Sequence, residues 1–177
     1  MTMNALSALI DELGAGVVVT DPAILASYRY DWARDPDAGT PLAVVRPTST
    51  EQVQTVLRWA SAHRVPVVPR GAGTGLSGGA TAVDGGIVLS TEKMREITVD
   101  PVTRTAVAQP GLLNAEVKKA VAAHGLWYPP DPSSYEICSI GGNIATNAGG
   151  LCCVKYGVTT DYVLGLQVVL ALSLIHI

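Results

Sequence analysis

The sequence predicts an α+β protein in which a small parallel βαβ part precedes a second, mixed or antiparallel α+β part. Residues 41–47 and 65–69 are short apolar runs with the amphipathic stretch 48–64 between them, the order of a strand, a helix and a strand. A unit of this kind joins parallel strands by a right-handed crossover. Closely spaced strand patterns with no helix between them then predict an antiparallel part, at 86–90, 97–100 and 104–110. A last apolar strand is expected at 163–171.

Helices are predicted from capping residues and from the spacing of apolar side chains. Residues 4–13 form a short amphipathic pattern near the N-terminus. Thr48 and Glu51 have the spacing of a capping box, which predicts the start of the helix in the βαβ unit. Another helix is expected over 114–124, where Gly125 supplies the stop signal.

Composition favours a globular protein and disfavours a nucleic-acid partner. Hydrophobic residues make up 48% of the 177 residues and charged residues 15%, which is typical of a chain that forms a core. The net charge is −3 and the arginines are scattered, so the basic stripe that phosphate backbones require is missing. Cys138, Cys152 and Cys153 have no CxxC spacing, and no metal site is predicted.

No transmembrane segment and no secretory signal are expected. The first basic residue is Arg29, whereas a signal peptide carries positive charge before its apolar run. The longest apolar stretch, 163–177, is shorter than the roughly 20 residues that a membrane-spanning helix needs. These features predict a cytoplasmic protein, either free or peripheral to the inner face of the membrane.

The stretch 70–79, RGAGTGLSGG, partly matches three known signatures. GxGxxG begins at Gly73, but a Rossmann turn needs a helix directly after it, and GATAVDGG follows instead. GxSxG centres on Ser77, but a serine hydrolase of that type needs Asp and then His later in the chain, and here His124 precedes Asp131. A Walker loop needs a lysine that this loop lacks. A serine hydrolase that uses Ser77 stays a remote alternative.

The same stretch, which we call the glycine loop (residues 70–79), has the properties of an anion site. It follows the carboxyl end of a predicted parallel strand, where ligands bind in open α/β sheets. Glycine lets the backbone approach a ligand closely, and successive N–H groups form a concavity that accepts phosphate oxygens. The loop therefore predicts a pyrophosphate site, and the alternative is a tight connection between two strands.

A second glycine-rich stretch, PPDPSSYEICSIGGNIATNAGG at 129–150, is called here the second segment. Its backbone donors, small hydroxyls and amides alternate with Ile140 and Ile144. Small residues permit close contact and amides read polar edges, so the segment suits a flat heteroaromatic ring. The alternative is an ordered Ω-loop.

Together, the two segments resemble the FAD-binding domain of the vanillyl-alcohol-oxidase/p-cresol-methylhydroxylase (PCMH) type. VPVVPRGAGTGLSGGA resembles the pyrophosphate loop of its FAD-linked oxidases, and PPDPSS…CSIGGNIATNAGG…KYG resembles their flavin-contacting segment. The similarity is to the branch that contains the D subunit of glycolate oxidase, D-lactate dehydrogenases and D-2-hydroxyglutarate dehydrogenases. It covers roughly residues 28–171, and two long motifs in the right order make it specific.

The resemblance implies a cofactor site built from both segments. In the glycine loop, backbone N–H groups would bind the FAD pyrophosphate, with three further residues beside them: Gly71, Ala72, Gly73, Thr74 and Gly75, then Arg70, Leu76 and Ser77. In the second segment, residues would line the ribityl chain and the isoalloxazine ring: Asp131, Ser139, Gly142, Asn143, Ala145 and Asn147. Relatives with covalently bound flavin carry a histidine where this chain has Thr74, so non-covalent FAD is expected.

The implied reaction is oxidation of a small 2-hydroxy acid to the 2-keto acid, with electrons passing from the flavin to an unidentified acceptor. The residues that bind substrate lie in this family's second domain, which is expected to be missing, so the fold is expected to be C-terminally truncated. No catalytic residue and no metal ligand are named. This chain alone is expected to be poorly soluble and to turn over no 2-hydroxy acid. A non-catalytic nucleotide-binding or FAD-binding fragment is the alternative.

Three regions are expected along the chain. Residues 1–40 would be an N-terminal helix and lead-in, and residues 41–171 an incomplete FAD-binding domain. Residues 172–177, LSLIHI, match the translation of a sequencing-library adapter end. They are expected to be a non-native tail.

Overall fold

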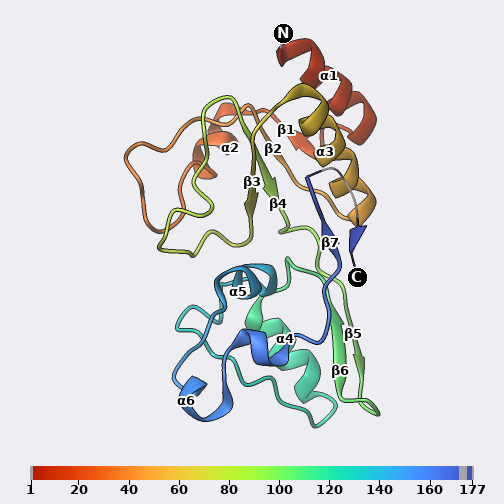
Figure 1. Ribbon diagram of the computed structural model, residues 1–177, viewed down its shortest axis with the longest axis vertical. Coiled ribbons are helices and arrows are strands. Elements are labelled where there is room, and N and C mark those ends of the chain that lie inside the picture. Colours follow the sequence, from red (N-terminus) through yellow and green to blue (C-terminus); the bar gives the residue numbers. More distant parts are fainter. Residues whose placement is uncertain (1, 172–174, 177) are drawn as a thin grey trace.

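The parallel part is a four-stranded sheet in the order β1-β2-β4-β3. A computed structural model describes residues 2–171 and 175–176. The sheet consists of β1 (Val18–Val19), β2 (Ala43–Val45), β3 (Val67–Arg70) and β4 (Ile87–Ser90). β2 and β3 both run parallel to β4, and β1 pairs with β2 in the antiparallel direction. Three helices cover this sheet in the upper half of Figure 1: α1 (Thr2–Leu13), α2 (Pro22–Ser27) and α3 (Thr50–His63).

The predicted strand–helix–strand unit is confirmed, but β4 lies between its two strands. The prediction that residues 86–90 belong to an antiparallel part was wrong. The irregular stretch from 71 to 86 is long enough to return the chain to the opposite end of the sheet, which allows a parallel strand without a helix. Every residue of β4 is buried, and the central position of a covered sheet buries both faces of a strand.

Alternate residues of β2 and β4 belong to two separate cores. On one face, side chains of both strands pack against α1 and α3, and this cluster includes Val45, Leu89, Leu9 and Val56. On the other face, Val44 and Val88 pack against Leu25 of α2. Full burial of each such side chain contributes about 1.5–3 kcal/mol, so β2 and β4 anchor the upper half.

α3 begins one residue later than the predicted capping box. Ser49 has extended backbone and its hydroxyl accepts from the N–H of Gln52 at 3.4 Å. Gln52 Oε1 in turn accepts from the N–H of Thr48 at 2.8 Å. The N-cap is therefore Ser49 in place of Thr48, and because Gln52 accepts from the residue before the cap, Ser49 and Gln52 do not form a reciprocal capping box.

The lower half has its own core. The predicted antiparallel pair is confirmed as β5 (Ile97–Asp100) and β6 (Thr105–Ala108). The predicted helix at 114–124 is confirmed as α4 (Asn114–Ala122), and Val117 and Val121 face the core. The second segment and its continuation contain α5 (Ile140–Thr146), α6 (Cys153–Tyr156) and the 3₁₀ helix η1 (Thr159–Tyr162).

The predicted strand at 163–171 is largely wrong. Only Val168–Val169 form a strand, β7, which pairs with β8 (Ile175–His176) and lies beside α3 (Figure 1). Leu164 and Leu166 are exposed on either side of Gly165, so apolar character here does not reflect burial. Of the expected tail, residues 172–174 and 177 lie outside the described residues.

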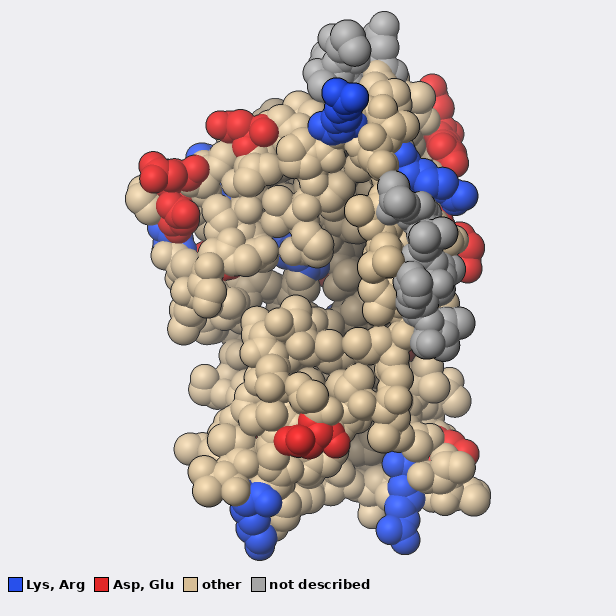
Figure 2. Space-filling model, viewed as in Figure 1, with Lys and Arg blue, Asp and Glu red and all other residues tan. Residues whose placement is uncertain are grey.

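No helix in the described part of the chain is long and apolar enough to cross a membrane. The face shown in Figure 2 carries scattered charged side chains and no continuous basic stripe.

Candidate functional site

The glycine loop leaves the carboxyl end of β3 and runs without a helix to β4. This arrangement confirms the objection to a Rossmann turn, because no helix N-terminus stands behind the loop. The loop is hydrogen-bonded to the segment between α2 and β2. The N–H of Trp32 donates to Gly75 O at 3.0 Å, and the N–H of Ala82 donates to Arg29 O at 2.9 Å.

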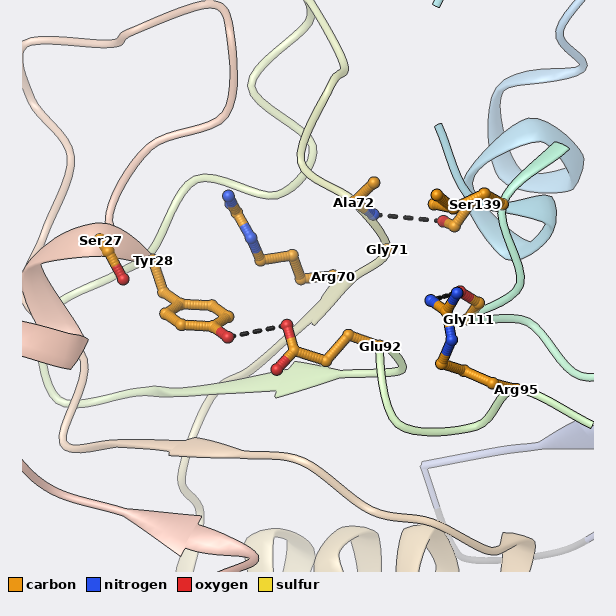
Figure 3. A pocket seen from close by; sticks show the side chains of 10 residues that line it. Ser27, Tyr28, Arg70, Gly71, Ala72, Glu92, Arg95, Gly111 and Ser139 are labelled. Atoms are coloured by element: carbon orange, nitrogen blue, oxygen red, sulfur yellow. Dashed lines mark hydrogen bonds between the residues drawn. The ribbon is translucent and has the colours of Figure 1, made fainter. Parts of the chain in front are cut away.

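Arg70 clamps the base of the loop. Its Nη1 donates to Tyr30 O at 2.8 Å and to Ala80 O at 3.3 Å, so it joins the two ends of the loop to the preceding segment. In Figure 3 its side chain runs toward Tyr28, away from Ser139, and its guanidinium lies 5.4 Å from the centre of the Tyr28 ring. Burial lowers the pKa of Arg70, against the opposing effect of the neighbouring Tyr28. A side chain on Gly73 would collide with this guanidinium.

The backbone donors of the loop are available to a ligand. None of the N–H groups from Gly73 to Gly79 donates to another residue in the part of the chain that the structure describes. Two further polar atoms beside the loop, Asp31 Oδ2 and Thr81 Oγ1, are buried without a hydrogen-bond partner among the described residues. Unpaired buried groups are costly, so the loop has hydrogen-bonding capacity that the chain itself does not use.

Ser139 joins the glycine loop to the second segment. It is buried and caps α5, with its Oγ accepting from the N–H of Gly142 at 3.3 Å. The same Oγ accepts from the N–H of Ala72 at 3.2 Å (Figure 3). A side chain on Gly71 would lie 2.4 Å from this oxygen, so the close approach requires glycine there. The two stretches singled out in the sequence therefore meet in space.

Asn143 is turned into the protein interior. It is only 3% exposed, and its Oδ1 accepts from Nδ2 of Asn114 at 3.1 Å. Asn114 also donates to Pro130 O at 3.2 Å, and Asn143 Nδ2 approaches Cys138 Sγ at 3.1 Å. These amides hold α4, α5 and the start of the second segment together, so Asn143 can approach a ligand only through its backbone.

The remaining predicted residues of the second segment divide into structural and accessible ones. Asp131 Oδ1 accepts from the N–H of Cys152 at 3.2 Å, and Asn147 Oδ1 accepts from the N–H of Thr160 at 3.0 Å. Asn147 ends α5 in the left-handed conformation, with φ 49°. Ala145 is exposed on α5 and offers only a small apolar surface.

A pocket of about 230 Å³ lies where the two halves meet, beside the start of the glycine loop. The space-filling view shows the molecule hollowed at this waist (Figure 2). The pocket is lined from both halves, by Ser27, Tyr28, Arg70, Gly71, Ala72, Glu92, Arg95, Gly111, Leu113 and Ser139. Tyr28 donates from its hydroxyl to Glu92 Oε2 at 2.7 Å (Figure 3). Burial raises the pKa of Tyr28, and so does the hydrogen bond to Glu92.

Sequence reasoning missed Tyr28, Glu92 and Asn114. Tyr28 and Glu92 are single polar residues outside any motif, and they meet only because α2 and the end of β4 converge. Asn114 is the first residue of α4, where polar residues are common. None of the three gives a local signal that separates it from an ordinary polar residue.

The serine hydrolase alternative gains no support. Ser77 is exposed, and it makes no hydrogen bond with either histidine whose side chain is described, His63 or His124. Within the described residues there is also no group of three or more His, Cys, Asp or Glu residues that could hold a metal ion.

Comparison with known proteins places these features in a family. A family model described as an FAD binding domain matches residues 41–176. The chain is 49% identical to glycolate oxidase subunit GlcD of Bacillus subtilis over 81% of its length, and 45% identical to D-2-hydroxyglutarate dehydrogenase of Stutzerimonas stutzeri over 92%. It is 44% identical to D-lactate dehydrogenase of Archaeoglobus fulgidus over 92%. The chain spans 31%, 36% and 37% of these relatives, about a third of each.

Solved structures share the fold. The chain matches alkyldihydroxyacetonephosphate synthase with a TM-score of 0.89 at 22% identity, covering 98% of this chain and 35% of that one. It matches p-cresol methylhydroxylase with a TM-score of 0.84 at 25% identity, covering 98% of this chain and 34% of that one. The α+β fold of PCMH type is therefore confirmed, and the cofactor of the family is FAD. Since the family model covers more than half of its residues, the chain belongs to the FAD binding domain family.

Proposed function

We propose that this chain is the FAD-binding portion of a flavin-dependent oxidoreductase that oxidises a small 2-hydroxy acid, such as glycolate or D-lactate, to the 2-keto acid. The observation that carries the proposal is the row of backbone N–H groups from Gly73 to Gly79 that have no partner among the described residues and lie next to the second segment. Hydrogen bonds from such groups to a charged acceptor are worth about 1.5–3 kcal/mol each. A few of them would hold a pyrophosphate without a metal ion.

The residues present fit FAD. The glycine loop would bind the pyrophosphate through backbone N–H groups, with Arg70 fixing the shape of the loop. The buried Ser139 would hold the second segment against the loop, where Gly142 and Ala145 allow close contact with a flat ring. FAD would supply acceptance of a hydride from the α-carbon of the substrate. In this proposal the substrate-binding residues lie outside this chain, and the electron acceptor is a separate, unidentified partner.

We further propose that the FAD is non-covalent, because Thr74 has no nucleophilic nitrogen. The three-part division into residues 1–40, 41–171 and 172–177 stays a prediction, as does a location in the cytoplasm or at the inner face of the membrane. A non-catalytic FAD-binding module is the second candidate. It is favoured by the family match itself, because the matching model describes an FAD binding domain and covers residues 41–176.

An added charge in the glycine loop tests the site. Ser77 is exposed, so Ser77→Asp leaves the fold intact, but its carboxylate repels the pyrophosphate. We expect FAD affinity, measured by equilibrium dialysis, to fall at least about tenfold, since a unit charge a few ångströms away costs about 1–4 kcal/mol. Ser61→Asp makes the same change at an exposed position of α3 and should leave the affinity unchanged.

Three results would count against the proposal. Equal affinities of the two aspartate variants would exclude the glycine loop as the pyrophosphate site. Absence of FAD binding by the unchanged chain would exclude the function altogether. Flavin that stays with the protein after acid precipitation would exclude non-covalent binding. Bleaching of the flavin absorbance by a 2-hydroxy acid in the full-length protein would support the oxidoreductase. An absence of bleaching in the full-length protein would support the non-catalytic module.

A further inference from the structure

Trp32 combines a fixed backbone with an open side chain. Its N–H donates to Gly75 O in the middle of the glycine loop at 3.0 Å. The preceding Asp31 is 3% exposed, and its Oδ1 accepts from the N–H of Ala33 at 2.9 Å. The Trp32 side chain is nevertheless 52% exposed. Tryptophan is enriched at contact surfaces because it pairs a large apolar ring with a polar N–H.

The Trp32 side chain lines a small pocket shared with the second segment. The pocket has a volume of about 140 Å³, and its other lining residues are Ser133, Ser134, Glu136 and Ile137. Ile137 is 47% exposed and supplies a second apolar surface. The two serines and Glu136 supply polar groups that suit the edge of a heterocycle. Whole small-molecule sites usually measure about 300–1,000 Å³, so this pocket matches one part of a larger ligand.

We propose that Trp32 stacks on one flat heteroaromatic ring of the dinucleotide whose pyrophosphate lies on the glycine loop. This inference rests on the proposed function. Because the backbone of Trp32 is hydrogen-bonded to Gly75, the Trp32 pocket adjoins the loop whose N–H groups would hold the phosphates. The shared chemistry is that of a planar, nitrogen-rich ring, which both the isoalloxazine and the adenine of FAD provide.

Trp127 offers a matched control. It is 57% exposed, nearly as much as Trp32, but it lies in the lower half and packs edge-on against Tyr156, with ring centres 4.8 Å apart. Neither the glycine loop nor either pocket involves it. A loss of binding that follows from removing any exposed tryptophan would appear in both variants, whereas a stacking role would appear only at Trp32.

The experiment compares Trp32→Leu, Trp32→Phe and Trp127→Leu with the unchanged 177-residue chain. Each is titrated with FAD, with FMN and with ADP by equilibrium dialysis, and each is checked for an unchanged unfolding midpoint. We expect Trp32→Leu to bind FAD about tenfold more weakly, since aromatic stacking is worth about that factor. Trp32→Phe keeps a ring and should recover most of the affinity, and Trp127→Leu should bind as the unchanged chain does.

The two smaller ligands identify the ring. A loss for FMN alone assigns the pocket to the isoalloxazine, and a loss for ADP alone assigns it to the adenine. Equal FAD affinity in Trp32→Leu and Trp127→Leu would overturn the inference while the proposed function stands. If the unchanged chain binds none of the three ligands, both fall. If Trp32→Leu fails to fold, affinity in Trp32→Phe equal to that in a Trp32→Ser variant would overturn it.

Discussion

The glycine loop and the second segment look alike in the sequence but use their polar groups differently. In the glycine loop, the N–H groups from Gly73 to Gly79 have no partner among the described residues. In the second segment, Ser139, Asn143 and Asn147 each hydrogen-bond to other parts of the chain. The loop therefore offers hydrogen bonds to a ligand. The polar side chains of the second segment hydrogen-bond within the chain instead, and the segment offers a ligand only a surface of small residues. Similar composition does not imply a similar role.

Asn114 provides the most severe test of this difference. Asn114→Ala removes the donor to Asn143 Oδ1 and to Pro130 O, and both acceptors are buried. Pro130 O then loses its donor, and Asn143 Oδ1 keeps only the weak Cys138 thiol at 3.6 Å, so the change should cost about 2–4 kcal/mol of the free energy of unfolding. We expect urea denaturation to show this loss without bound FAD, because the amides act in folding. A normal unfolding midpoint combined with lost FAD binding would contradict the structural role.

The contact between the two regions gives the next largest effect. Ser139→Ala removes the cap of α5 and should cost about 1 kcal/mol. Gly71→Ala introduces a side-chain atom 2.4 Å from Ser139 Oγ, and overpacking of this kind costs about 1–3 kcal/mol. In the Ser139→Ala background this clash is gone, so Gly71→Ala should cost clearly less.

A double-mutant cycle from the urea unfolding curves measures that coupling. Independent sites would give additive free energies. Additivity here would mean that the glycine loop and the second segment are not held together through Ser139. The two segments would then be separate regions and not one site.

How much of this arrangement the sequence predicts depends on the range of the contacts. The glycine loop and its place after β3 follow from local spacing of glycines and apolar residues. α5 was missed because Gly141 and Gly142 disfavour a helix, although Ser139 as a cap and the Ile140–Ile144 spacing were local signals for it. The insertion of β4 between β2 and β3 has no local signal. Neither has the pairing of Asn114 with Asn143, which are 29 residues apart.

The same distinction applies to the site residues. The resemblance placed Asn143 and Asn147 among the flavin contacts, but residue type alone does not say which way a side chain points. The structure turns Asn143 inward, where its partner Asn114 lies on another helix. Trp32 was overlooked for a different reason. Its hydrogen bond to Gly75 connects residues that are distant along the chain, so no local pattern links Trp32 to the glycine loop.

The smallest expected effect concerns pH and compares Tyr28, which contacts Arg70 at the start of the glycine loop, with a tyrosine of the second segment. Burial and the hydrogen bond to Glu92 raise the pKa of Tyr28, whose ring centre lies 5.4 Å from the Arg70 guanidinium. The unfolded tyrosine then loses its proton at a lower pH than the folded one. The stability that Tyr28 contributes is therefore fully present below the ordinary tyrosine pKa and is lost as pH rises through the folded pKa. Tyr28→Phe should flatten the fall of the urea midpoint above about pH 10, the ordinary tyrosine pKa. Tyr135→Phe, at a 39% exposed position of the second segment, should leave that fall as it is. If the two variants behaved alike, the buried hydrogen bond between Tyr28 and Glu92 would not be the source of the loss of stability at high pH.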